Sequence, residues 1–289
     1  MKPMPQLAQA PAPTVLPFVI DLELTNACPA DCVMCPRDKL PKLGIMKDLV
    51  FERLLKDLSG TSTLRYISLC GIGEPLLHPH FFEWVPRLAA LWYRPQVGLV
   101  TGGERLTPEV WDRLPTLGLR QVEMSVQAVE PGLYAQLMPG LSFERVMANI
   151  EHIARHPNPR IPFSISYTEH DGNRAHSADL HRYFAARRVP VKTTELHSRA
   201  GNLVNPILRV GPTKVPAERR CMIFEKIAFV AYDGRIQFCC HDVARRHVVG
   251  DLVSDGLVAI NARKTEMVRA GGPSADICAA CDDPLRTTL

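Results

Sequence analysis

The sequence contains no apolar run long enough to cross a membrane as a helix. Its first seventeen residues hold five prolines and no continuous apolar core, so they lack the central feature of a secretory signal peptide. The formal net charge of +4 is small, and the arginine pairs are scattered without aromatic residues around them, which argues against a nucleic-acid-binding face. We therefore expect a cytoplasmic protein that binds neither membranes nor nucleic acid, with a disordered lead-in over residues 1–16.

Cysteine, in contrast, is plentiful, with nine in 289 residues. Without an export signal, clustered cysteines in a reducing compartment are more often metal ligands than disulfides. Cys28, Cys32 and Cys35 form one group, with three residues and then two between them. Three thiolates leave the fourth ligand position of a metal site open, and thiolates in this number select zinc or an iron–sulfur cluster.

Short β-rich segments alternate with helical ones from residue 17 to about 200. The expected strands are residues 18–25, 65–70, 96–101, 121–126, 163–168 and 191–197. Six strand–helix units without hairpins predict an α/β fold of parallel strands wrapped by helices. Six units rather than eight predict a partial (β/α)6 barrel, in which the chemistry takes place at the carboxyl ends of the strands.

Two motifs at these strand ends resemble the radical S-adenosylmethionine (SAM) superfamily. The cysteine triplet, C-x3-C-x2-C, follows the first strand, and G-I-G-E-P at residues 71–75 follows the second, with Ile72 where the family usually has a glycine. The resemblance implies that the triplet binds a [4Fe–4S] cluster that chelates S-adenosylmethionine. It also implies that Gly73 and Glu74 hold the methionine amine of this cofactor and that Ser125, after the fourth strand, contacts its ribose.

The first strand carries two carboxylates on one face. Asp21, Glu23 and Thr25 alternate with apolar residues, although a central barrel strand is expected to be apolar on both faces. Buried carboxylates require a partner, and a cationic or polyhydroxylated substrate would provide one. The alternative is an edge strand whose polar side meets water. Arg199, after the sixth strand, is a further candidate for orienting a substrate.

Residues 201–289 lack the strand–helix alternation and hold the remaining cysteine motif. A hairpin is predicted with Asp233-Gly234 at its turn, and four cysteines surround it in the sequence: Cys221, Cys239, Cys278 and Cys281. This arrangement resembles Twitch, a shortened SPASM domain, and implies a second, auxiliary [4Fe–4S] cluster bound by the four thiolates. From the residues alone, a structural zinc site is an equal alternative. We therefore divide the chain into a radical SAM partial barrel at 17–200 and a small α+β auxiliary-cluster domain at 201–289.

Cys70 and Cys240 belong to neither motif. We expect Cys70 to be structural. Cys240 directly follows Cys239, so in a strand its side chain points the opposite way, toward a cavity between the domains. A thiol in that cavity can return a hydrogen atom to a substrate radical, although Cys240 also fits a small buried residue or a replacement cluster ligand.

The resemblance extends to aminoglycoside epimerases and aminocyclitol dehydrogenases of antibiotic biosynthesis. It implies a 5′-deoxyadenosyl radical that abstracts a hydrogen atom from a C–H bond of a polar small molecule, and an external one-electron reductant of the flavodoxin or ferredoxin type. We predict epimerisation of an amino sugar or aminocyclitol with Cys240 as hydrogen donor. The alternatives are oxidation of a secondary alcohol through the auxiliary cluster, modification of a peptide, or a zinc-containing binding protein.

Overall fold

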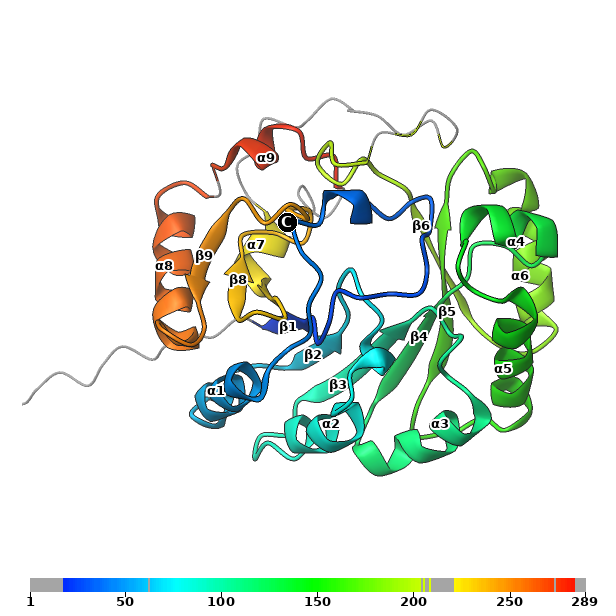
Figure 1. The fold of residues 1–289 in the computed structure, drawn as a ribbon, viewed down its shortest axis with the longest axis horizontal. Coiled ribbons are helices and arrows are strands. Elements are labelled where there is room, and N and C mark those ends of the chain that lie inside the picture. The colour runs from blue at the N-terminus through cyan, green and yellow to red at the C-terminus, as the bar shows by residue number, and fades with distance from the viewer. Residues whose placement is uncertain are drawn as a thin grey trace, which may run out of the picture.

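A single curved sheet organises the part of the chain that the computed structural model describes, residues 18–61, 63–203, 205, 208, 221–272 and 274–283. Its strand order is β6-β5-β4-β3-β2-β1-β7-β8-β9 (Figure 1). The expected lead-in over residues 1–16 lies outside the described residues. None of the helices in the described ranges is long and apolar enough to cross a membrane.

The first six strands form the parallel part of the sheet, and each coincides with a predicted segment to within a few residues. They are β1 (Val19–Leu22), β2 (Tyr66–Leu69), β3 (Gln96–Thr101), β4 (Gln121–Ser125), β5 (Phe163–Glu169) and β6 (Val191–Glu195). All neighbouring pairs among them are parallel. The predicted α/β fold with a partial parallel barrel is confirmed.

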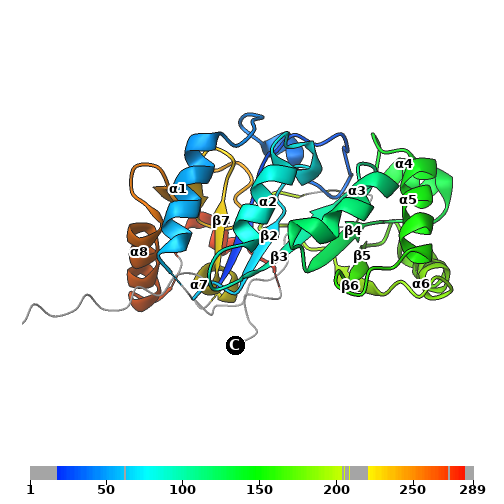
Figure 2. The ribbon, with the colours of Figure 1, turned by 90° about the horizontal axis from the view of Figure 1, so that it is seen from below.

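Helices cover the outer, convex side of these strands (Figures 1 and 2). They are α1 (Asp48–Ser59), α2 (Phe81–Ala89), α3 (Pro108–Arg113), α4 (Pro131–Leu137), α5 (Phe143–Arg155) and α6 (Ser177–Ala185), with short 3₁₀ turns at Arg37–Lys39, Pro75–Leu77, Leu114–Leu117 and Arg174–His176. Each α-helix buries an apolar stripe against the sheet or its neighbours; in α1, for example, Phe51 stacks on Trp84 of α2 at 4.1 Å between ring centroids.

The C-terminal residues extend the same sheet. Their elements are α7 (Met222–Lys226), β7 (Ile227–Val230), β8 (Arg235–Gln237), β9 (Val248–Asp251), α8 (Leu257–Arg269) and α9 (Asp276–Ala279). β7 pairs in parallel with β1, and β8 then pairs antiparallel with β7 through the predicted turn, where Gly234 has a φ of 88°. The sheet is therefore continuous across the expected domain boundary. Because β1 lies between β2 and β7, the edge-strand alternative is wrong.

Two hydrophobic clusters stabilise this arrangement. The larger one lies between the parallel strands and the outer helices. The smaller one lies in the C-terminal segment and includes Phe224 and Phe238 together with Cys221 and Cys281. The cysteines of the second motif are therefore part of a small apolar core. Small domains with little core commonly depend on a bound metal for their stability.

Candidate functional site: two cysteine centres and the cavity between them

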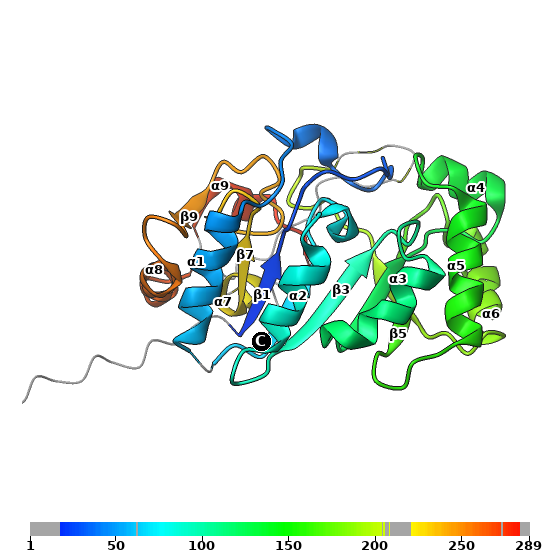
Figure 3. The same cartoon turned by 60° about the horizontal axis from the view of Figure 1, so that its bottom comes forward.

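The three-cysteine loop follows β1 and crosses the carboxyl ends of the strands (Figure 3). The Arg37 guanidinium holds the loop from inside by donating to the carbonyls of Cys28 and Ala30 at 2.9 and 2.7 Å. The Asp31 amide donates to the Pro139 carbonyl just beyond α4 at 2.7 Å. The loop is thus fixed both internally and against the barrel.

The three thiols lie close enough to influence one another. Burial, together with the charges of Cys35 and Cys28, raises the pKa of Cys32 to about 12. Burial also raises the pKa of Cys28 and of Cys35. Three adjacent thiols are a donor set for an iron–sulfur cluster, and the positive charge of the metal would hold them as thiolates despite their burial. The donor set fits the cluster that the sequence predicts.

The G-I-G-E-P segment packs tightly against the start of the cysteine loop. A Cβ on Gly73 would lie 2.1 Å from the Thr25 carbonyl oxygen, so the contact requires glycine. Glu74 is 4% exposed, and its carboxylate accepts hydrogen bonds from the Thr101 hydroxyl at 2.8 and 2.9 Å and from the Gly102 amide at 2.8 Å. Burial raises the pKa of Glu74, and the Gly102 amide opposes this. Glu74 therefore ties together the ends of β2 and β3.

A cavity at this end of the barrel brings together most of the predicted cofactor residues. Its lining includes Cys28, Cys32, Gly73, Glu74 and Ser125. These residues come from the ends of β1, β2 and β4, as the parallel topology requires. We refer to it as the cofactor cavity.

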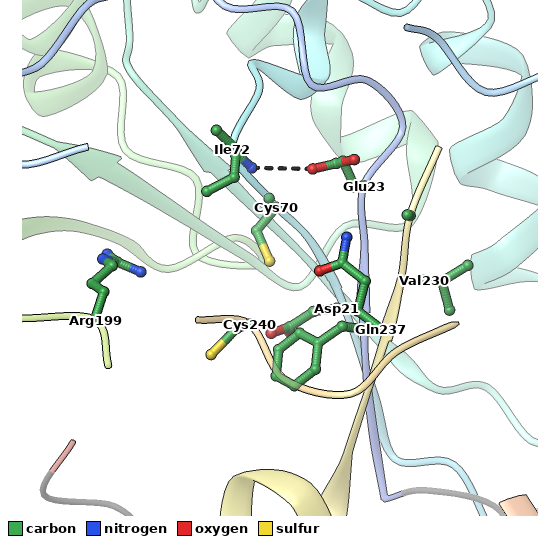
Figure 4. Close-up of a pocket in the computed structure, with 11 residues that line it drawn as sticks. Asp21, Glu23, Cys70, Ile72, Arg199, Val230, Gln237 and Cys240 are labelled. Atoms are coloured by element: carbon green, nitrogen blue, oxygen red, sulfur yellow. Dashed lines mark hydrogen bonds between the residues drawn. The ribbon is translucent and has the colours of Figure 1, made fainter. Parts of the chain in front are cut away.

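A second cavity of about 240 Å³ lies next to it, between the barrel and the C-terminal segment. Its lining includes all four residues predicted for substrate binding or hydrogen donation: Asp21, Glu23, Arg199 and Cys240 (Figure 4). Cys70 and Gly71 line both cavities. The structure thus places Cys70, expected to be structural, on the wall that the two cavities share. We refer to the second cavity as the substrate cavity.

Glu23 has its charge partner within the protein. Its carboxylate forms an ion pair with Arg245, whose side chain is 2% exposed and also lies over the Tyr232 ring at 4.9 Å. The Ile72 amide adds a long hydrogen bond of 3.4 Å to the same carboxylate (Figure 4). We expected a substrate to compensate the charge of Glu23. The structure shows instead that Arg245, in the loop after β8, compensates it.

Asp21 is the second carboxylate of β1 in the cavity. Burial raises its pKa to about 6, and a hydrogen bond with Cys70 partly opposes the shift. At neutral pH this carboxylate is mostly ionised, at a cost in solvation that a bound cation would relieve. Of the two carboxylates, Asp21 is the one suited to a substrate ammonium.

Arg199 lies across the cavity from Asp21 (Figure 4). It has a φ of 49°, and its buried Nε has no hydrogen-bond partner among the described residues. An unsatisfied buried donor is costly, and a ligand oxygen in the cavity would satisfy it. Arg199 is therefore suited to a hydroxyl or carboxylate oxygen of a bound molecule.

The four cysteines of the second motif line one small, almost entirely apolar pocket with Phe224, Phe238 and Ile277, and we call it the auxiliary pocket. Cys239 and Cys240 lie beyond the end of β8 rather than in a strand, yet Cys239 lines this pocket and Cys240 lines the substrate cavity. Their sulfur atoms lie within 4.8 Å of each other. Cys240 is therefore positioned between the auxiliary pocket and the substrate cavity.

A buried polar cluster beside Cys240 was missed by sequence reasoning. His241 Nε2 and Asp283 Oδ2 are 2.7 Å apart, and Nε2 of His197 lies 3.6 Å from the same carboxylate oxygen. The Cys240 sulfur lies 3.7 Å from His241 Nδ1. Asp283 is 42 residues from His241 in the chain. A local motif could not have linked these residues, because the tail after α9 brings them together.

Comparison with known proteins agrees with this geometry. The profile of the family described as "Radical SAM superfamily" matches residues 22–170, slightly more than half of the chain. The chain belongs to the radical SAM superfamily. A second profile, "Iron-sulfur cluster-binding domain" of the SPASM type, matches residues 221–282. The cofactors implied by these two radical SAM and SPASM domains are S-adenosylmethionine and two [4Fe–4S] clusters, as predicted, rather than zinc.

Similar proteins share the fold and differ in what they act on. A "Tungsten-containing aldehyde ferredoxin oxidoreductase cofactor-modifying protein" of Pyrococcus furiosus is 26% identical over 136 residues, which cover 45% of this chain and 38% of that protein. The structure of BtrN with AdoMet and 2-DOIA superposes with a TM-score of 0.65 at 19% identity, over 94% of this chain and 96% of BtrN. SuiB of Streptococcus suis, bound to the precursor peptide SuiA, gives 0.69 at 10% identity, over 93% and 71%.

The first curated relatives are considerably longer than the region matched. The chain spans 35 to 44% of their length. The chain shares the superfamily with proteins of known sequence and the fold with the solved structures.

Proposed function

We propose that this radical SAM enzyme epimerises one carbon of a small cationic polyol, of the amino sugar or aminocyclitol type, with Cys240 as hydrogen donor. The observation that carries the proposal is the position of Cys240. Cys240 lines the substrate cavity, and Cys70 and Gly71, which line the same cavity, also line the cofactor cavity. A substrate bound between Cys240 and the residues shared with the cofactor cavity would have the cofactor on one face and a thiol on the other.

The lining of the substrate cavity supports a small cationic polyol. Asp21 supplies a carboxylate for an ammonium group, and Arg199 and Gln237 supply donors and an acceptor for hydroxyl groups. The volume of about 240 Å³ is below the ~300–1,000 Å³ of sites for drug-sized ligands. Such a space is better suited to a single ring than to a peptide chain. This favours a small molecule, even though SuiB, which has a similar fold, was solved with a precursor peptide.

The residues of the chain account for the second half of the reaction. When bound, S-adenosylmethionine at the first cluster supplies the radical that removes the substrate hydrogen, and the auxiliary cluster supplies one electron. The S–H bond of Cys240 then breaks as a C–H bond forms on the other face of the ring, which inverts that carbon. The sulfur radical takes up the electron and a proton to restore the thiol. The cofactor site also requires an external one-electron donor for each reductive step.

Turnover of a panel of aminoglycosides and aminocyclitols in heavy water tests this proposal. The expected product is an isomer of unchanged composition that carries one deuterium at the inverted carbon, because the Cys240 thiol exchanges with solvent. Cys240→Ala should still form 5′-deoxyadenosine but give no labelled isomer. A labelled isomer from Cys240→Ala would contradict the proposal.

A second candidate is oxidation of a secondary alcohol on the same substrate class. The pKa of about 6 for Asp21 favours it, because a carboxylate with a raised pKa is a better base for an alcohol proton. The two reactions differ in product mass. A product lighter by two hydrogens, formed equally well by Cys240→Ala, would replace epimerisation with dehydrogenation.

A further inference from the structure

Lys264 is buried on the inward face of α8, next to the auxiliary pocket. It follows Leu257 and Ile260 on the buried stripe of this helix and is only 4% exposed. Such a stripe normally holds apolar side chains, because moving an ammonium group out of water is costly unless a partner compensates its charge. A lysine at this position therefore requires a compensating partner.

The contacts of Lys264 direct its charge toward the auxiliary pocket. Its Nζ donates to the Ile227 carbonyl at 2.6 Å and lies 4.9 Å from the centroid of the Phe224 ring, which itself lines the pocket. Both of these partners are neutral, and among the described residues Lys264 has no ion pair with a carboxylate. Because Phe224 lines the auxiliary pocket together with the four cysteines, the ammonium group lies beside this pocket.

The protonation of Lys264 is consistent with this position. Burial lowers its pKa to about 8, and the charges of Cys239 and Cys221 oppose the shift. A group with this pKa is mostly protonated at neutral pH. The auxiliary pocket is otherwise almost entirely apolar, so a charge beside it is weakly screened.

We propose that Lys264 is the countercharge of the auxiliary [4Fe–4S] cluster and raises its reduction potential. A cluster with four thiolate ligands carries net negative charge, which increases when it accepts an electron. A nearby ammonium group therefore stabilises the reduced form more than the oxidised form, and charges around a cluster are among the factors that set its potential. The proposal rests on Cys221, Cys239, Cys278 and Cys281 as ligands and is independent of the substrate.

The midpoint potential of the auxiliary cluster, measured by redox titration with electron paramagnetic resonance, tests the proposal in the full-length chain. A Cys28→Ala/Cys32→Ala/Cys35→Ala background removes the signal of the first cluster. Lys264→Gln and Lys264→Met should lower the potential, and Lys264→Arg should leave it near that of the parent. Lys226→Gln is the matched control, because Lys226 is exposed at the end of α7 and its loss should leave the potential unchanged.

Two results would overturn the proposal. One is a potential in Lys264→Gln that equals or exceeds that of the parent. The other is loss of the auxiliary iron from Lys264→Gln, Lys264→Met and Lys264→Arg alike, which would show that the shape of the lysine rather than its charge is required. Iron that is lost from Lys264→Gln and Lys264→Met but retained in Lys264→Arg would support the role of the charge. Failure of the epimerase proposal would not change these results, because the titration requires no substrate.

Discussion

Glu23 and Arg245 are 222 residues apart in the chain and form a buried ion pair. Glu23 follows β1, and Arg245 lies in the loop between β8 and β9, in a left-handed backbone conformation with a φ of 55°. The side chains of both are at least nine-tenths buried, so neither can exchange its partner for water. The pair fastens the C-terminal loop onto the barrel at one side of the substrate cavity.

Removing Arg245 should therefore destabilise the protein strongly. Arg245→Met leaves the Glu23 carboxylate buried without its cation, and breaking a buried pair in this way costs about 3–5 kcal/mol of unfolding free energy. Chemical denaturation measures the loss. The exposed neighbour Arg246 is the control, and Arg246→Met should change stability by less than about 0.5 kcal/mol. Adding Glu23→Gln to Arg245→Met should recover part of the loss; no recovery would mean that Arg245 acts through packing alone.

Asp21 should destabilise the fold at neutral pH. Its pKa is about 6 in the folded state and near 3.8 in the unfolded state, so the folded state binds the proton more tightly. Stability therefore falls as pH rises from about 4 to 6 and stays lower above that range. Asp21→Asn should raise the unfolding free energy by about 2–3 kcal/mol at pH 7.5, with a smaller gain at pH 5. A gain that is independent of pH would indicate that the carboxylate charge is not its cause.

The same substitution should weaken substrate binding. Asp21→Asn removes the charge proposed to face a substrate ammonium, so a variant that is more stable should turn over less. Michaelis constants measured with the active member of the aminocyclitol panel test this trade-off. An unchanged constant would remove Asp21 from the substrate site.

Iron and sulfide analysis of anaerobically purified protein should distinguish the two cysteine groups. The parent should hold about eight irons per chain, four in each cluster. Cys28→Ala/Cys32→Ala/Cys35→Ala should leave about four, and so should replacement of all four auxiliary cysteines by alanine. Cys240→Ala should keep about eight; a loss there, together with retention in Cys239→Ala, would make Cys240 the ligand and contradict its role as hydrogen donor.

Gly73→Ala should disturb the first cluster site without unfolding the barrel. The new Cβ would lie 2.1 Å from the Thr25 carbonyl oxygen, at the start of the cysteine loop, so the loop has to move. We expect loss of the first cluster's iron and of S-adenosylmethionine binding, with the auxiliary iron retained. Gly60→Ala is the matched control, because its nearest atom would lie 3.6 Å away. Full iron content in Gly73→Ala would show that the contact can relax.

The features that were predictable from the sequence are those encoded locally. Cys28, Cys32 and Cys35 lie on one short loop, so their spacing alone indicates a metal site. The six parallel strands follow from apolar segments separated by helical ones, and the parallel order then places Glu74 and Ser125 at the same end of the barrel. The metal site depends on residues that are close in sequence, and the shared position of Glu74 and Ser125 depends on the rule that parallel strands have their carboxyl ends at the same end of a barrel.

The features that were not predictable depend on contacts between distant segments. The addition of β7 to β1 cannot be read from either segment, and it decides that Glu23 meets Arg245 rather than a substrate. Asp283 reaches His241 only because the chain after α9 folds back. In the sequence Cys70 is an ordinary residue at the end of a strand segment. Its place in the lining of two separate cavities follows only from the folded arrangement.

The unbroken ladder from β6 to β9 restricts how a substrate can enter. Since β7 is hydrogen-bonded along β1, the C-terminal segment cannot swing away as a rigid flap without rupturing backbone bonds in the middle of the sheet. A substrate therefore has to enter without separation of the barrel from the C-terminal segment, and the same sheet joins the strand that leads to the cysteine loop with the strands that lead to Cys239.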